Sequence, residues 1–143
     1  MENNMSISKN SLINLETNET YTSFVPNTLE EQKRMFNAIN NPNFRVGDMI
    51  NKTINIADVI LTGVELSDND GYEGDTEKAA RKAIRTILID DNGNSYAATS
   101  DGISTSVKSL LSVFGTLHFD DPITVEIKQV TTKRGSLLTF VLV

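Results

Sequence analysis

The fold is decided by residues 85–117, which read RTILIDDNGNSYAATSDGISTSVKSLLSVFGTL. The first part is a short β-branched and apolar run that ends at Asp90. The Asn92-Gly93 pair after it predicts a tight type I′ turn, because both central residues of that turn need positive φ. Residues 95–99 then form the returning strand of a hairpin.

An amphipathic helix is predicted directly after this hairpin. Ser100 is a good N-cap, and Gly115 lies where a C-cap is expected. Between them apolar side chains recur at i, i+4, i+7, i+8 and i+11, which is one face of an α-helix. The residues of this stripe are Ile103, Val107, Leu110, Leu111 and Phe114. We expect Phe114, like Phe140 in the last strand, to lie in the core.

The composition limits the class of protein. A chain of 143 residues suits one domain with an appendage. Thirteen Lys and Arg against 19 Asp and Glu give a formal charge of −6, which excludes a uniformly basic surface but permits a local basic patch. The chain has no cysteine, so disulfides and thiolate zinc sites are excluded. No run approaches the roughly 20 apolar residues of a membrane span, and we expect a soluble, cytoplasmic protein.

Three further strands and a second helix are predicted around the central stretch. Residues 28–41 form a helix that starts with a capping box of Thr28 and Glu31. Residues 53–67 form a long strand with Ile54, Ile56 and Ile60 on one side and Gly63 as the site of a bulge. After the central helix, residues 123–132 and 137–143 form the last two strands.

Beyond residue 50 the order is therefore strand, strand, strand, helix, strand, strand. A mainly β, five-stranded Greek-key barrel with its helix between strands 3 and 4 has this order, and this is the OB-fold. A generic α+β sandwich is the alternative. We assign residues 27–143 to this domain. Residues 1–26, which are polar with scattered apolar side chains, are either a disordered tail or an arm that docks on a neighbouring subunit.

OB barrels usually bind on the face of strands 2 and 3, flanked by the connections between strands 1 and 2 and between strands 4 and 5. Here these connections are residues 68–82 and 132–136, and both carry bases. The candidate phosphate contacts are Lys52, Lys78, Arg81, Lys82, Arg85, Lys133 and Arg134. The cluster at 78–85 follows seven acids in residues 58–77, so it could instead be the solvated partner of that acidic run.

Flat side chains are needed for stacking on bases, and Tyr96 and Tyr72 are the candidates. Each has a structural alternative. Tyr96 could be a core tyrosine with a hydrogen-bonded hydroxyl, and Tyr72 could fix its own loop. Because aromatic residues are few, we expect modest affinity with a strong salt dependence.

Metal and catalytic sites are poorly supported by the sequence. An EF-hand that starts at Asp68 would need Gly at residue 73 and Glu at residue 79, where the chain has Glu73 and Ala79. The single histidine, His118, follows a helix C-terminus, which is a structural position for a cation. We expect no enzyme, no metal and no cofactor.

Several segments resemble a known family. They are Phe36-Asn37-Ala38, the long first strand, Gly71-Tyr72-Glu73-Gly74-Asp75, Asp91-Asn92-Gly93-Asn94-Ser95-Tyr96, the central helix and Thr131-Thr132-Lys133-Arg134-Gly135. Over roughly residues 30–143 the chain resembles the small single-stranded-DNA-binding proteins of protein-primed podophages. It also resembles the OB-fold DNA-binding proteins of Gram-positive conjugative plasmids. The resemblance implies sequence-tolerant coating of single strands during replication or plasmid transfer.

Two hypotheses remain at this point. The first is a non-enzymatic OB-fold protein that binds single-stranded DNA and assembles on it through the N-terminal arm. The second is an assembly module of the same fold whose DNA binding is incidental. The fold and a few bases fit double-stranded DNA as well as single strands, and no membrane partner is expected.

Overall fold

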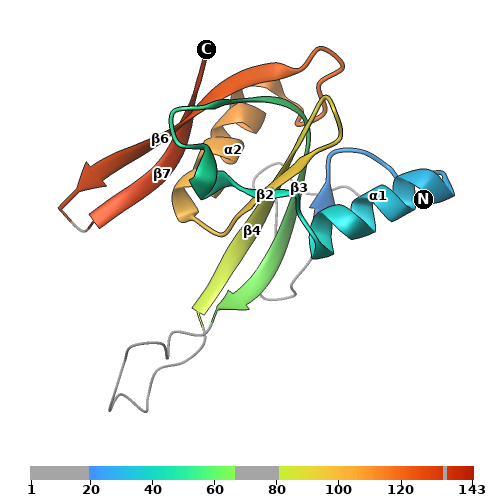
Figure 1. Cartoon of the computed structure of the whole chain (residues 1–143), viewed down its shortest axis with the longest axis horizontal. Helices are drawn as coiled ribbons and strands as arrows, with labels where there is room; N and C mark the ends of the chain where they lie inside the picture. The colour runs from blue at the N-terminus through green and yellow to red at the C-terminus, as the bar shows by residue number, and fades with distance from the viewer. Residues whose placement is uncertain (1–19, 67–80, 134) are drawn as a thin grey trace.

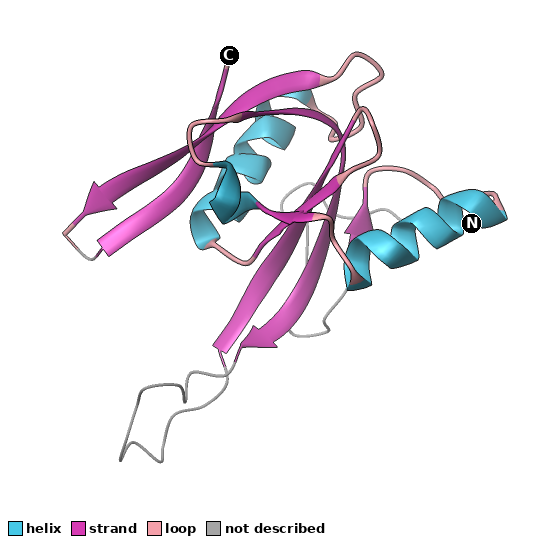
Figure 2. Ribbon diagram, viewed as in Figure 1, coloured by secondary structure: helices cyan, strands magenta, loops and turns pink. Residues whose placement is uncertain are grey.

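The computed structural model describes residues 20–66, 81–133 and 135–143. In these residues seven strands form one curled sheet, a half-barrel, accompanied by two helices (Figures 1 and 2). The elements are β1 Thr20–Thr22, α1 Leu29–Asn40, β2 Phe44–Arg45, a 3₁₀ turn Val46–Met49, β3 Thr53–Leu66, β4 Arg81–Asp90, β5 Ser95–Ala98, α2 Asp101–Phe114, β6 Ile123–Thr132 and β7 Gly135–Leu142. The sequence did not predict the short strands β1 and β2.

The sheet is organised around β3. Its order is β2-β5-β4-β3-β6-β7, and β1 pairs with β3 outside this path. All these pairs are antiparallel except β2 with β5, which is parallel. The first residues of β3 pair with β6 and the remainder with β4. The change of partner coincides with the bend that curls the sheet.

The irregularity in β3 lies between Ile56 and Asp58, whereas Gly63 pairs in regular register with Ile84. The bulge predicted at Gly63 is therefore wrong. The carbonyl group of Ala57 accepts instead from the amide of Phe119, at 2.9 Å. The extra residue reverses the alternation of side chains along the strand.

This reversal explains why the apolar pattern of β3 breaks in its middle. Ile54 and Ile56 lie in the main core before the bulge, and Val59 and Leu61 lie in it afterwards. Ile60 faces the opposite side, contrary to its predicted position beside Ile56, and belongs to a second cluster of apolar residues.

The two helices cover opposite faces of the sheet. The main core lies under α2, which contributes Ile103, Val107 and Leu110. The second cluster joins Ala38 of α1 to Ile60 of β3 and to two isoleucines of β4. The β3–β4 pair is thus buried on both faces, and α1 covers an outer face rather than one end of the core.

Both helix starts follow the predicted capping. Thr28 and Glu31 form the capping box of α1. The Ser100 hydroxyl accepts from the amide of Gly102, and Gly115 ends α2 with φ of 76°. Phe140 lies in the core as expected, but Phe114 is 42% exposed and packs edge-on against Phe119. The core position predicted for Phe114 is wrong, because α2 ends at the rim of the sheet.

The β4–β5 turn differs from the predicted type I′ turn. Gly93 has φ of 87°, but neither Asp91 nor Asn92 has positive φ. The amide of Gly93 donates to the carbonyl of Asp90, and the amide of Asp90 donates to the carbonyl of Asn94. This is a three-residue loop with a left-handed glycine in its last position.

The last part of the predicted N-terminal arm lies on the chain's own sheet. Thr20–Thr22 pair with Thr62, Leu61 and Ile60, and Tyr21 packs against the main core. A three-residue strand has too few side chains to show an alternating pattern, so β1 could not be predicted from the residues alone. Residues 1–19 lie outside the described residues.

Candidate nucleic-acid interface

An open groove lies between the β4–β5 pair and β7. Its volume is about 650 Å³. The residues that line it come from β2, the 3₁₀ turn, β4, β5 and β7, and they are Pro42, Arg45, Gly47, Asp48, Arg85, Ala97, Ala98, Thr99, Ser100 and Leu138. We call it the arginine groove.

Two guanidinium groups lie in this groove. Arg45 pairs with Asp48, with 3.3 Å between Nε and Oδ2, and both side chains are largely exposed. Arg85 is partly buried and donates from Nη1 to the carbonyl of Ile39 in the last turn of α1. Exposed ion pairs are weak, so a phosphate group can compete with Asp48 for the Arg45 guanidinium.

The floor of the groove is formed by small side chains. Ala97 of β5 is the register partner of both Arg45 and Ile87, which places it between β2 and β4. Ala97 points toward the second cluster and Ala98 toward the main core, and both line the groove at this edge of the sheet. A polynucleotide backbone can therefore approach the sheet between the two arginines.

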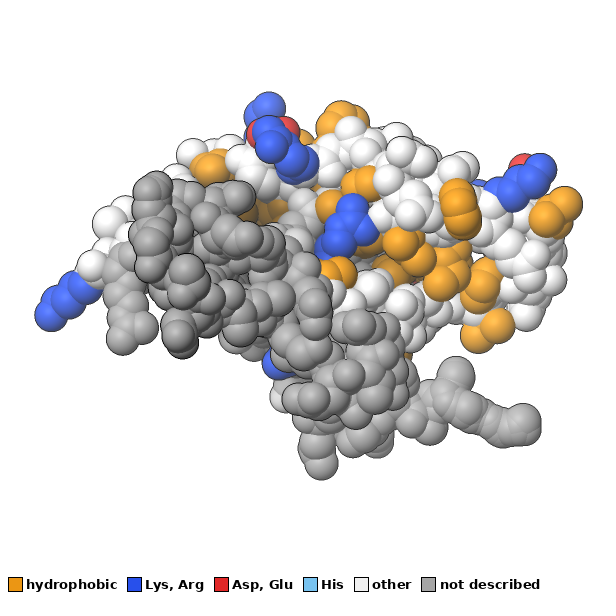
Figure 3. Space-filling model, turned by 90° about the horizontal axis from the view of Figure 1, so that it is seen from below, with side chains coloured by type: hydrophobic (Ala, Val, Ile, Leu, Met, Phe, Trp, Pro, Cys, Tyr) orange, Lys and Arg blue, Asp and Glu red, His pale blue; other side chains and the backbone are white. Residues whose placement is uncertain are grey.

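The face of the molecule seen from below in Figure 1 carries several basic side chains. The β3–β4 pair and the β6–β7 pair both run toward the lower side of Figure 1. Figure 3 views this side: basic side chains are spread over the described part of the face, hydrophobic ones gather between and beside them, and acidic ones are sparse. On this face, basic side chains are thus more prominent than acidic ones among the residues that the structure describes.

Tyr96 is part of the main core. It is 7% exposed, and its hydroxyl donates to Oδ2 of Asp90 at 2.8 Å. Burial, the hydrogen bond to Asp90 and the negative charges of Asp90 and Asp91 raise the pKa of Tyr96 to about 12. This arrangement matches the structural alternative for Tyr96, and its ring offers little surface to a base.

The exposed ring at this position belongs to Phe44. It stacks on Tyr96 with 5.2 Å between the ring centroids and is 46% exposed. In the dipeptide Phe44-Arg45 the two side chains point to opposite faces of the edge strand β2, Phe44 beside Tyr96 of the main core and Arg45 beside Ala97, which packs against the second cluster. The sequence analysis did not select Phe44 or Arg45 as candidate DNA contacts. An aromatic residue next to a cation between Pro42 and Gly47 could have indicated them.

The other predicted contacts are spread over the chain. Lys133 is exposed in the β6–β7 turn, and Lys52 is exposed just before β3, outside the lining of the groove. The backbones of Arg81 and Lys82 form the start of β4, in register with Leu66 and Glu65. Three contacts, Tyr72, Lys78 and Arg134, lie outside the described residues. Among the predicted contacts whose side chains the structure describes, Arg85 and no other lines the groove.

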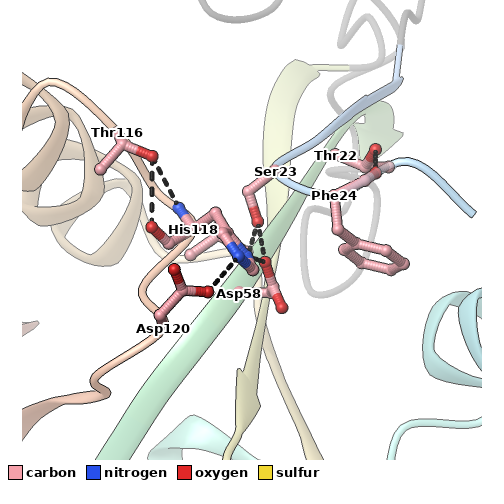
Figure 4. A network of polar contacts seen from close by, with 8 residues as sticks. Thr22, Ser23, Phe24, Asp58, Thr116, His118 and Asp120 are labelled. Carbon is pink, nitrogen blue, oxygen red and sulfur yellow. Dashed lines mark hydrogen bonds and ion pairs between the residues drawn. The ribbon is translucent and has the colours of Figure 1, made fainter.

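His118 belongs to a polar network away from the groove (Figure 4). Its Nδ1 lies 2.7 Å from Asp58 and its Nε2 lies 2.9 Å from Asp120. The Ser23 hydroxyl donates to Asp58 and accepts from the amide of Val59. In this order a carboxylate separates the serine from the histidine, so the two do not form a nucleophile and base pair. The network ties the segment after β1 to β3 and to the loop after α2.

Metal and membrane sites were also sought in residues 20–66, 81–133 and 135–143. These residues contain no group of three or more side chains suited to hold a metal ion. Neither helix in them is long and apolar enough to span a bilayer. The acidic positions from Asp68 to Asp75 that we tested as a calcium loop lie outside the described residues.

A curled sheet with an open, arginine-lined groove over small side chains is typical of proteins that bind nucleic acid strands. A family model described as phage single-stranded DNA-binding protein, of the Phi29 type, matches residues 14–142. The chain belongs to this family, whose function is DNA binding and not catalysis. No curated protein and no solved structure matches the chain.

Proposed function

We propose that this protein coats single-stranded DNA with little regard to sequence, with the strand lying in the arginine groove. Membership of the phage single-stranded DNA-binding family supports the choice of ligand. The groove between β4–β5 and β7 supports the location, because it combines guanidinium groups with an accessible floor. This combination is the observation that carries the proposal.

The proposal includes an OB-fold assignment. In it β3, β4, β5, β6 and β7 are the five barrel strands, and α2 lies between the third and fourth of them in the chain. The arginine groove then lies over strands 2 and 3, which is the usual binding face of this fold. The strands β1 and β2 are additions to the barrel.

The phosphates are neutralised by Arg45 and Arg85 in the groove, with Lys133 at the end of the β6–β7 pair. We keep Lys52, Lys78, Arg81, Lys82 and Arg134 as further contacts. Phe44 replaces Tyr96 as the nearest stacking surface, because its ring is the exposed member of the stacked pair. Tyr72 stays a second candidate.

We also propose that subunits associate on DNA through residues 1–19, where Ile7, Leu12, Ile13 and Leu15 provide apolar contacts. The biological setting would be phage-type replication or plasmid transfer in a cytoplasm. Size-exclusion chromatography with and without oligonucleotide, on the full chain and on a variant that lacks residues 1–19, tests the association. Equal elution of both proteins with DNA would contradict it.

Fluorescence anisotropy with a labelled 30-nucleotide strand at two salt concentrations tests the groove. Arg45→Ala should weaken binding and lower the slope of log affinity against log salt by about 0.7, the value for one lost phosphate contact. Lys108→Ala, an exposed lysine on α2, is the matched control and should leave both unchanged. Equal losses for the two variants would place the strand elsewhere.

A further inference from the structure

The outer surface of α1 carries a stripe of side chains that the packing of this helix leaves free. Leu29, Lys33 and Phe36 follow one another at i, i+4 and i+7, so they share one face. The buried side of α1 is formed by Ala38 with Met35 and Ile39. Phe36 is 63% exposed, although it is a large aromatic side chain on a well-formed helix. We call these three residues the α1 stripe.

The C-terminal end of α1 lies close to the arginine groove. Arg85, which lines the groove, donates to the carbonyl of Ile39, and Pro42 just after α1 also lines it. Phe36 is three residues before Ile39, which is about 4.5 Å along the helix axis. Figure 3 shows hydrophobic side chains on the right, where α1 lies, on the same face as the basic side chains nearer the centre.

The charge on α1 favours a polyanion beside this stripe. Its two acids, Glu30 and Glu31, lie in the first turn, where they stabilise the helix start. Residues 32–40 contain Lys33 and Arg34 and no acid. Arg85 adds a cation at the end of the helix, where the last carbonyl groups would otherwise repel phosphate.

From this juxtaposition we propose that single-stranded DNA continues from the arginine groove across α1, with one base stacked on Phe36 and a phosphate bound by Lys33. The inference rests on the proposed function and extends its binding path. An exposed phenyl ring beside a cation meets the two needs of sequence-tolerant strand binding, a stacking surface and a phosphate contact. A helix that precedes the barrel thereby becomes part of the binding surface.

The chain contains no tryptophan, so one introduced indole reports its own surroundings. In the full chain, the fluorescence of Phe36→Trp should be quenched when an oligo(dT) strand is added. Val113→Trp is the control, because Val113 is 74% exposed on α2 and lines a different groove. Quenching of both variants to the same extent, or of neither, would overturn the stacking at Phe36.

Anisotropy measures the energetic effect. Phe36→Ala should weaken binding roughly 5- to 150-fold, the range for one lost stacked base, with an unchanged thermal midpoint because the ring is exposed. Lys33→Ala should lower the salt slope by about 0.7, and Lys108→Ala should not. If the wild-type chain binds and Phe36→Ala binds equally well, this inference alone fails. If the wild-type chain does not bind the strand at low salt, the proposed function fails with it.

Discussion

The hydroxyl group of Tyr96 donates to a carboxylate that also organises the β4–β5 turn. Asp90 accepts this bond at Oδ2, while its Oδ1 accepts from the amides of Asn92 and Asn94. Asp90 is itself buried, so each bond compensates part of the cost of burying a charge. Tyr96 therefore stabilises the β4–β5 turn through Asp90, and its ring stacks on the ring of Phe44.

Tyr96→Phe removes one hydrogen bond to a buried carboxylate and adds no atoms. We expect it to lower the free energy of unfolding by about 1.5–3 kcal/mol, the range for hydrogen bonds to charged groups. Urea denaturation followed by circular dichroism measures this. A midpoint equal to that of the wild type would show that the hydroxyl is not needed.

His118 gives the stability of the fold a dependence on pH. The hydrogen bond to Asp58 raises the pKa of His118 above its ordinary value of 6.5, burial opposes this, and the charge of Asp58 and the contacts with Asp120 add to it. Because the folded pKa is raised, the stabilisation is fully present below pH 6.5. It is lost as the pH rises through the folded pKa.

We therefore expect the difference in thermal midpoint between the wild type and His118→Asn to shrink as the pH is raised from 6 to 9. The effect should be small, because the imidazole is half exposed. The protection factor of the Ser23 amide, which corrects for the intrinsic pH dependence of exchange, should fall over the same interval in the wild type. A difference that grows with pH would contradict the network.

At the residue scale, we propose that the ion pair of Arg45 and Asp48 weakens DNA binding. Asp48→Asn removes the carboxylate that competes with phosphate for the guanidinium. We expect this variant to bind single-stranded DNA more tightly than the wild type, in the opposite direction to Arg45→Ala. Anisotropy at low salt compares the DNA affinities of Asp48→Asn and the wild type. Weaker binding by Asp48→Asn would contradict the role of Arg45.

At the scale of elements, the start of α2 closes against β7 through Gly102. A Cβ atom on Gly102 would lie 1.9 Å from the carbonyl oxygen of Leu138 and 2.8 Å from Leu137. No rotamer change relieves a clash with backbone, so only glycine permits this approach. The close contact holds β7, one wall of the arginine groove, against the helix.

Gly102→Ala should therefore destabilise the protein by about 1–3 kcal/mol, although alanine normally favours a helix. Gly47→Ala is the control, because its Cβ would meet Leu138 at an ordinary 3.9 Å. Denaturant titration of both variants makes the comparison. Equal free energies of unfolding for the two variants would show that α2 and β7 can move apart to fit the alanine without loss of stability.

Local patterns predicted an element well where its own residues carry the capping or periodicity pattern. Neighbouring residues were enough to predict four features: the N-cap at Ser100, the apolar face of α2, the capping box at Thr28 and the bounds of β6. The bulge at Ala57 did not, because it arises where β3 changes partner from β6 to β4. The strand β2 was missed for the same reason, since two residues become a strand only by pairing with β5.

At the scale of the whole molecule, the candidate site depends on contacts between segments that are distant in the chain. Arg45, Arg85 and Leu138 meet in one groove, and no spacing in the sequence relates them. Sequence reasoning placed most of its bases on the connections at 68–82 and 132–136, whereas the groove is centred on strands and is lined by Arg85 of β4. The sequence left open whether Tyr96 stacks on bases or lies in the core, because its hydroxyl reaches Asp90 only through the register of β4 and β5.

The central claim is that single-stranded DNA lies in the arginine groove. Amide chemical shifts of the labelled full chain, recorded during titration with an unlabelled oligo(dT) strand, test this most directly. We predict the largest shifts at residues 42–48, at Arg85 and at residues 97–100, with further shifts along α1. Shifts confined to α2 and the end of β7, with these residues unchanged, would contradict the account.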